Sequence, residues 1–176
     1  MLFRSLAVDS SKAILSITYA DPSDLVAGRA FNSVVAERLP ATRTVRVDNR
    51  TTDAEYATLA AQADSAALVL VSAYVSPREF AGSLGAQGGF SPFVEKLALS
   101  GKPIIVISFG SPYLLSAFPS VSSYLLAWGG APISQRAAAL ALLGEREING
   151  RLPISLPPSL PFGAGVHRSQ TRTHNQ

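Results

Sequence analysis

The sequence predicts an α/β fold with a mostly parallel sheet of about five to six strands and helices on both faces, a three-layer sandwich. Short apolar runs alternate along the chain with segments of helical periodicity, which is the pattern of consecutive β-α-β units. The runs at residues 66–72 and 103–108 are apolar at nearly every position, as expected of strands covered on both faces. A chain of 176 residues has the length of one domain.

The first half of the chain supplies three of these strands and two helices. The strands are expected at residues 12–18, 44–47 and 66–72. Asp21 and Asp24 are typical of a helix start, and apolar residues then recur at helical spacing until Pro40 ends the segment. A second helix is expected after Thr52, because Thr52 and Glu55 have the spacing of a capping box.

A long connection follows the third predicted strand. It runs from Tyr74 to Phe90 and contains four glycines, which makes it longer than most connections between a strand and a helix. We expect a loop of this length to serve function or to contact a partner.

The second half continues the alternation. We expect a helix from Ser91 to its glycine stop at Gly101, a helix over 132–143 ended by Gly144, buried strands at 103–108 and 122–128, and an edge strand at 152–156. The edge position follows from Pro153, which has no N–H to donate to a ladder. We therefore assign residues 1–10 to an N-terminal extension, 11–160 to the α/β domain and 161–176 to a flexible tail.

Composition excludes several classes of protein. Hydrophobic residues make up 47% of the chain and charged residues only 15%, which excludes a disordered chain. A surface covered by a partner is one candidate explanation for so few charges. The absence of cysteine excludes a disulfide scaffold and a thiolate metal site. The net charge of +3 comes without a cluster of basic and aromatic residues, so no nucleic-acid partner is expected.

Membrane insertion and secretion signals are not predicted either. No apolar run approaches the roughly 20 residues of a spanning helix. The first nine residues lack the apolar core of a signal peptide. The chain is therefore either cytoplasmic or a fragment that begins downstream of its targeting sequence, and a secreted or periplasmic parent agrees with the second case.

Common catalytic motifs do not occur in the sequence. The first strand is not followed by G-x-G-x-x-G, and there is no P-loop. His167 and His174 lie in the predicted tail, so no base is expected beside Ser108 or Ser111, which we interpret as turn residues. We expect neither a metal nor a cofactor.

Four residues are candidates for contact with a substrate. Glu79 in the long loop is the candidate general acid or base, and Arg78 lies beside it; the alternative is a solvated ion pair. Tyr113 follows the fourth strand and Trp128 lies at the end of the fifth, where an aromatic ring can stack on a sugar. For both aromatic residues the alternative is a packing role in the core or between domains.

Three segments of the second half resemble a known family. Residues 101–115 read GKPIIVISFGSPYLL, residues 124–144 continue in the same order, and residues 148–157 read INGRLPISLP. Together they resemble the C-terminal domain of family 3 glycoside hydrolases, most closely the β-N-acetylhexosaminidase branch. Ser111 departs from the family pattern, in which asparagine is commoner at this turn.

The resemblance implies a flavodoxin-like accessory domain of a retaining glycosidase. The catalytic Asp of this family lies on an N-terminal (β/α)8 barrel, which this chain does not contain. The acid/base of the hexosaminidase branch is also on the barrel, whereas in the β-glucosidase branch the C-terminal domain lends a Glu. No motif match assigns that role to Glu79. The implied partners are the barrel and, indirectly, its carbohydrate; an isolated chain is also a candidate homodimer.

Two alternatives of other classes stay open on the sequence alone. One is a stand-alone module that binds a sugar or a nucleotide at the strand ends. The other is a structural or oligomerisation domain.

We predict that the purified chain does not hydrolyse an aryl N-acetylglucosaminide, because the resemblance places the nucleophilic Asp on another domain. A chromogenic assay checks this. Turnover that disappears in Glu79→Gln would contradict it.

Overall fold

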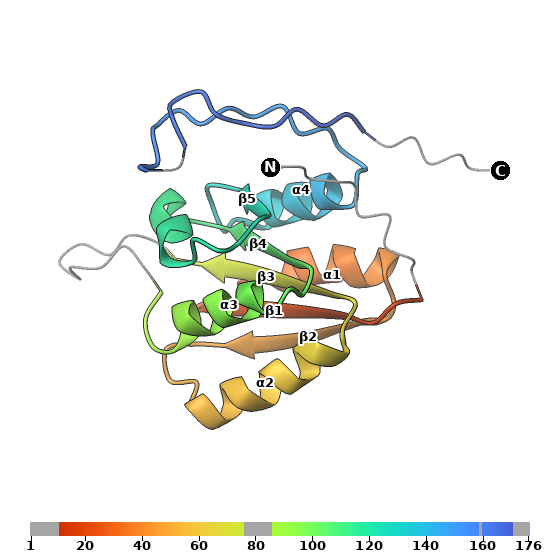
Figure 1. Cartoon of the computed structure of the whole chain (residues 1–176). Helices are drawn as coiled ribbons and strands as arrows, with labels where there is room; N and C mark the ends of the chain where they lie inside the picture. Colours follow the sequence, from red (N-terminus) through yellow and green to blue (C-terminus); the bar gives the residue numbers. More distant parts are fainter. Residues whose placement is uncertain (1–10, 76–85, 159, 171–176) are drawn as a thin grey trace.

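A five-stranded, all-parallel sheet organises the computed structural model, which describes residues 11–75, 86–158 and 160–170. The strand order is β2-β1-β3-β4-β5 (Figure 1). The strands are β1 (Ile14–Ala20), β2 (Thr42–Val47), β3 (Leu68–Tyr74), β4 (Ile104–Ser108) and β5 (Tyr124–Leu126). The predicted α/β class with a parallel sheet is confirmed.

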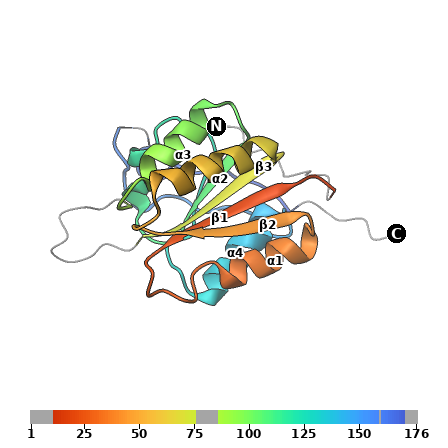
Figure 2. The same ribbon diagram turned by 90° about the horizontal axis from the view of Figure 1, so that it is seen from below.

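Helices cover both faces of the sheet, which completes the three layers (Figure 2). On one face lie α2 (Asp53–Ser65), α3 (Phe90–Leu99) and the short 3-10 helix η1 (Pro112–Ala117). On the other lie α1 (Arg29–Arg38) and α4 (Pro132–Leu142). None of the helices in the described part of the chain is long and apolar enough to cross a membrane.

Each face of the sheet has its own apolar core because side chains alternate along a strand. On β1, Leu15 and Ile17 face α2 and α3, whereas Ile14 packs with α1 and α4. The strands β3 and β4 are buried at every position, as the doubly apolar runs predict, and β1 is buried at every position as well. The predicted run at 122–128 is different: β5 has only three residues, all half-buried, because it is the last strand at one edge.

The predicted start of the first helix is wrong. Asp21 and Asp24 do not begin α1 but close two turns before it: Asp21 Oδ1 accepts hydrogen bonds from Ser23, and Asp24 Oδ1 accepts from the N–H groups of Val26 and Ala27. The helix begins only at Arg29, after Gly28 in the left-handed region at φ 80°.

The predicted edge strand at 152–156 is also wrong. Residues 147–158 and 160–170, here called the C-terminal arm, fold back on each other instead of joining the sheet (blue in Figure 1). Their pairing is reduced to isolated antiparallel bridges, Ile148 with Arg168 and Leu156 with Leu160. Prolines between these bridges interrupt the ladder because they have no N–H to donate.

Several local predictions are confirmed. Thr52 and Glu55 form the capping box of α2, and Gly101 and Gly144 take positive φ at the ends of α3 and α4. The domain boundaries at residues 10 and 160 stay predictions.

Gly28 lies against a buried polar cluster between β1, β3 and α1. Thr18 Oγ1 is 3.1 Å from Ser72 Oγ and accepts a hydrogen bond of 3.1 Å from Asn32 Nδ2. A Cβ at Gly28 would lie 2.7 Å from Thr18 Oγ1. Both the left-handed backbone and the close approach therefore require glycine here.

We predict that Gly28→Ala lowers the free energy of unfolding by about 2–3 kcal/mol, the sum of the left-handed penalty and the clash with Thr18. Gly101→Ala is the matched control, since Gly101 has φ 77° but open space around it. It should cost only about 1 kcal/mol. Urea denaturation measures both, and equal losses would show that contact with Thr18 contributes nothing.

Candidate functional site

The carboxyl edge of the sheet is the place where this topology puts a functional site. The helices that follow β1 and β3 lie on opposite faces of the sheet, so the chain diverges between these neighbouring strands. Such a switch point forms a crevice at the carboxyl ends of a parallel sheet. The connections β1–α1, β4–η1 and β5–α4 reach this edge, as does the described part of the β3–α3 connection.

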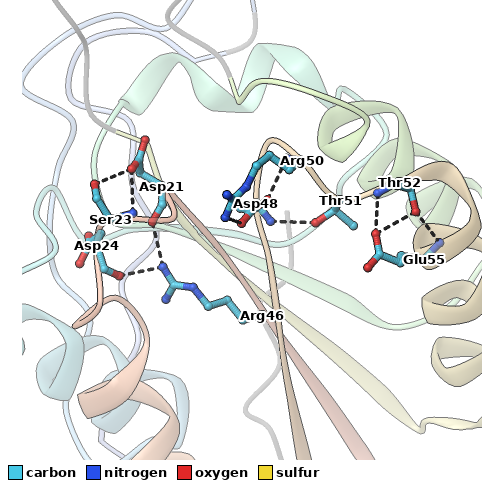
Figure 3. A network of polar contacts seen from close by, with 9 residues as sticks. All are labelled: Asp21, Ser23, Asp24, Arg46, Asp48, Arg50, Thr51, Thr52 and Glu55. Atoms are coloured by element: carbon cyan, nitrogen blue, oxygen red, sulfur yellow. Dashed lines mark hydrogen bonds and ion pairs between the residues drawn. The ribbon is translucent and has the colours of Figure 1, made fainter.

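Arg46 of β2 holds the β1–α1 connection in place (Figure 3). Its Nη2 donates to the backbone carbonyls of Asp21 at 3.0 Å and Asp24 at 2.7 Å, and its Nη1 donates to Ala27 at 3.3 Å. One guanidinium therefore satisfies three carbonyls of a connection that has no regular structure. The use of a charged donor makes these bonds stronger than neutral ones.

Asp48 of the neighbouring β2–α2 connection and Glu55 in the first turn of α2 both accept hydrogen bonds from nearby backbone N–H groups (Figure 3). Asp48 accepts from the Arg50 N–H at 2.8 Å, and this bond keeps the pKa of Asp48 below its usual value. Glu55 accepts from the Thr52 N–H at 2.7 Å, which likewise lowers the pKa of Glu55. Hydrogen bonds that favour the charged form leave both carboxylates ionised at neutral pH, which does not suit a general acid.

Gln135 of α4 joins two connections at this edge from inside the protein. It is completely buried. Its Oε1 accepts from the N–H groups of Ala30 at 3.1 Å and Phe31 at 3.3 Å, two of the unpaired donors in the first turn of α1. Its Nε2 donates to the carbonyls of Gly130 at 2.8 Å and Val26 at 3.3 Å. One amide thus caps a helix 105 residues away in sequence and fixes two loops beside each other.

Aromatic stacking supports the same edge. Tyr74, at the end of β3, stacks on Phe109 with ring centroids 4.6 Å apart, and Gly130 lies directly on the Tyr74 ring. Burial raises the pKa of Tyr74 well above its usual value, so the phenol stays neutral. Near the C-terminal end of the 74–90 loop, the Tyr19 hydroxyl accepts a hydrogen bond from the Gln87 N–H at 2.9 Å and fixes the chain just before α3.

Trp128 is held outward by a strained turn. It takes φ 59°, in the left-handed region, and the Gly129 N–H donates to the Ala127 carbonyl at 2.7 Å across it. Its side chain is 47% exposed, and that of Tyr113 is 44% exposed. Strained backbone of this kind persists where the surrounding structure imposes it and is common at binding sites.

The other sequence candidates have separate outcomes. Arg78 and Glu79 lie outside the described residues, as does most of the Tyr74–Phe90 loop. Ser108 and Ser111 are completely buried, and Ser108 Oγ donates to the Ser111 carbonyl at 2.9 Å, which confirms their turn role. No group of three or more acidic, His or Cys residues gathers within residues 11–75, 86–158 and 160–170.

Sequence reasoning missed the two residues that shape the edge. In the sequence, Arg46 is a single arginine in a short strand. Its carbonyl partners lie in a segment that was predicted to be helical, whereas α1 begins only at Arg29. Gln135 carried a signal: it is a lone amide on the buried, alanine-rich face of a helix. A polar group in that position requires partners.

Exposed apolar side chains gather at the carboxyl edge. The described residues include eight large apolar side chains that are exposed, and five of them follow the carboxyl ends of strands. These five, here called the edge cluster, are Leu25, Val26, Tyr113, Trp128 and Ile133. The hydrogen bonds of Gln135 to the carbonyls of Val26 and Gly130 bring the segment of Leu25 and Val26 close to the segment of Trp128 and Ile133. Tyr113 follows β4 at the same edge.

Comparison with known proteins agrees with this architecture. The profile of the glycosyl hydrolase family 3 C-terminal domain matches residues 8–175. Among solved structures, a fungal multi-domain family 3 β-N-acetylglucosaminidase is similar, with 21% identity and a TM-score of 0.72 over 91% of this chain and 17% of that chain. The family 3 β-N-acetylglucosaminidase from Paenibacillus sp. has 20% identity and a TM-score of 0.59 over 78% of this chain and 26% of that one.

A β-glucosidase from Erythrobacter marinus is also similar, with 14% identity and a TM-score of 0.61 over 90% of this chain and 31% of that one. No curated protein matches the chain. The chain therefore spans between 17% and 31% of the length of these three structures.

We predict that Gln135→Met lowers the free energy of unfolding by about 2–4 kcal/mol, because buried donors and acceptors lose their partners while the volume is kept. Arg136→Met is the control: the same side chain enters the exposed neighbouring position and should change stability by less than about 0.5 kcal/mol. Thermal and urea denaturation measure both. A Gln135→Met protein as stable as the parent would contradict the bracing role.

Proposed function

The chain belongs to the glycosyl hydrolase family 3 C-terminal domain family, and on this premise we propose that it is the accessory α/β domain of a glycoside hydrolase. Its carboxyl edge docks against the catalytic domain, a (β/α)8 barrel of β-N-acetylhexosaminidase or β-glucosidase type. The solved structures that it resembles are much longer chains, which agrees with a partner domain in the same protein.

The observation that carries this proposal is the edge cluster. Leu25 is 67% exposed on the β1–α1 connection and Ile133 is 76% exposed in the first turn of α4, although Arg46 and Gln135 hold the backbone of these segments in place. Apolar side chains that gather on one surface are typical of a protein–protein interface. The other exposed large apolar side chains of the described residues are Leu99 at the end of α3 and Phe162 and Val166 on the C-terminal arm.

The edge is also prepared for binding before a partner arrives. Arg46 fixes the β1–α1 connection, and Gln135 joins that connection to the β5–α4 connection. Loops that are already ordered lose little conformational entropy on docking, so more of the burial energy becomes affinity. An edge built in this way suits a permanent contact between two domains.

The sequence candidates take their places within this proposal. Tyr113 and Trp128 lie at the docking edge, where they contact either the catalytic domain or a sugar at the junction. Arg78 and Glu79 belong to the loop that leaves the same edge, and we propose that this loop reaches the sugar site. The nucleophile is supplied by the catalytic domain, and this chain contributes contacts to it.

The test is association with the catalytic polypeptide of the same protein, expressed separately and mixed with this chain. We expect a one-to-one complex by light scattering. Ile133→Asp should weaken it at least about tenfold, because the change removes an apolar contact of about 2 kcal/mol and buries a charge.

Leu99→Asp is the matched control. Leu99 is equally apolar and 71% exposed, but it lies at the C-terminal end of α3, away from the carboxyl edge. It should leave association unchanged. No complex, or an equal loss in the two variants, would contradict docking through the edge cluster.

A further inference from the structure

We propose that the free edge of β5 is a second docking site, which accepts an extended, apolar polypeptide segment with an acidic residue as an added strand. This site lies along the side of the sheet and shares only Trp128 with the edge cluster. The proposal does not depend on the identity of the catalytic domain. It rests on three features: the backbone of β5, the cavity beside it, and the charge of the cavity wall.

The backbone of β5 offers hydrogen bonds on one side only. The Ser123 carbonyl accepts from the Val106 N–H at 3.0 Å, and the Ala127 N–H donates to the Ser108 carbonyl at 2.9 Å. Backbone groups of successive residues alternate between the two sides of a strand. Tyr124 and Leu126, which alternate with these residues, therefore direct their N–H and C=O groups away from β4.

The sequence of β5 itself carries none of the residues that usually block an edge strand, and no described residue pairs with its outward side. Native edge strands are commonly blocked by proline, by lysine or by a bulge. The β5 sequence is Tyr-Leu-Leu, and all three residues are half-buried. No β-bridge joins β5 to the C-terminal arm in the described part of the chain, although the arm runs past it (Figure 1).

A cavity of about 320 Å³ separates β5 from the arm. Its walls are mostly apolar and come from both sides, with Leu126 and Trp128 from β5 and its end, and Leu152, Leu156 and Leu160 from the arm. Apolar walls beside an unpaired backbone edge match the two requirements of strand addition. The backbone supplies hydrogen bonds, and alternate side chains of the added strand enter the apolar space.

The charge of the wall selects the chemistry of the added segment. Arg151 lines the cavity, and its described lining contains no acid. Its Nη1 donates to the Gly165 carbonyl at 2.8 Å, and a guanidinium carries four further N–H donors. An aspartate or glutamate on the incoming segment is complementary to this charge.

The position of the arm favours a single added segment over a second copy of the chain. A second copy would have to bring its own sheet and arm to β5, whereas the arm already borders the cavity on its outer side. A single extended segment needs only the space between β5 and the arm. We therefore assign the site to one strand of polypeptide rather than to a symmetric dimer.

The experiment uses the full chain and the synthetic peptide acetyl-Asp-Leu-Thr-Leu-Thr-Leu-amide. Trp128 is the only tryptophan of the chain and lines the cavity, so its fluorescence reports binding. We expect a saturable change. A peptide N-methylated at alternate residues should bind at least about tenfold more weakly, since it loses strand hydrogen bonds. A peptide with lysine in place of aspartate should also bind more weakly.

Two protein variants isolate the backbone contribution. Leu126→Ala and Leu126→Pro both lose the leucine side chain, but only the proline variant loses the outward N–H. Leu126→Pro should bind the peptide at least about tenfold more weakly than Leu126→Ala. The N-methylated peptide gives the same answer if the proline variant does not fold.

Three outcomes would overturn the proposal. The first is the absence of a saturable response to any peptide. The second is binding that is indifferent to N-methylation, which would mark an apolar site without strand pairing. The third is a dimer by light scattering that prevents peptide binding, which would assign the edge of β5 to a second copy.

Discussion

The buried amide of Gln135 is the interaction on which the working edge of this domain depends. A parallel sheet places the loops that follow its strands at one edge, but it does not fix those loops relative to one another. Gln135 does so with two acceptor and two donor contacts, and it caps α1 from α4. Gly28 leaves α1 without a side-chain cap of its own, so the distant amide replaces a local one.

The two surfaces of the domain differ in how they are prepared. At the carboxyl edge, exposed apolar side chains rise from loops that Arg46 and Gln135 hold firmly. Along β5 the situation is reversed. The strand is regular, but no described residue pairs with its outer side, and the described part of the arm beside it has only isolated bridges. The low fraction of charged residues in the sequence agrees with both surfaces, because at each of them apolar side chains stay exposed to solvent.

The layers could be predicted from the sequence because each strand and helix is determined by the pattern of residues within its own segment. A run that is apolar at nearly every position, such as β3, is expected in the interior of a sheet that is covered on both faces. The capping box of Thr52 and Glu55 and the helix stops at Gly101 and Gly144 are also local, and they were correct. The match of the family profile over residues 8–175 confirms the resemblance that the closing GRLP motif indicated.

What the sequence could not predict depends on contacts between distant residues. Asp21 and Asp24 have the chemistry of a helix start, but Arg46 holds their connection as turns and delays α1. The predicted strand at 152–156 does not join the sheet, because the N–H groups of Leu152 and Leu156 donate to Ala164 and Leu160 in the returning half of the arm. The edge cluster was equally invisible, since its residues come from three connections that only the fold brings together.

The central claim is that Gln135 holds the edge rigid, and hydrogen exchange at one amide tests it directly. The N–H of Ala30 is in the first turn of α1, where amides ordinarily exchange quickly, but it donates to Gln135. We predict that the amide of Ala30 is so well protected that it exchanges only when the whole domain unfolds. The amide of Ala54, in the first turn of α2, should exchange orders of magnitude faster. Equal, fast exchange at Ala30 and Ala54 would contradict the account.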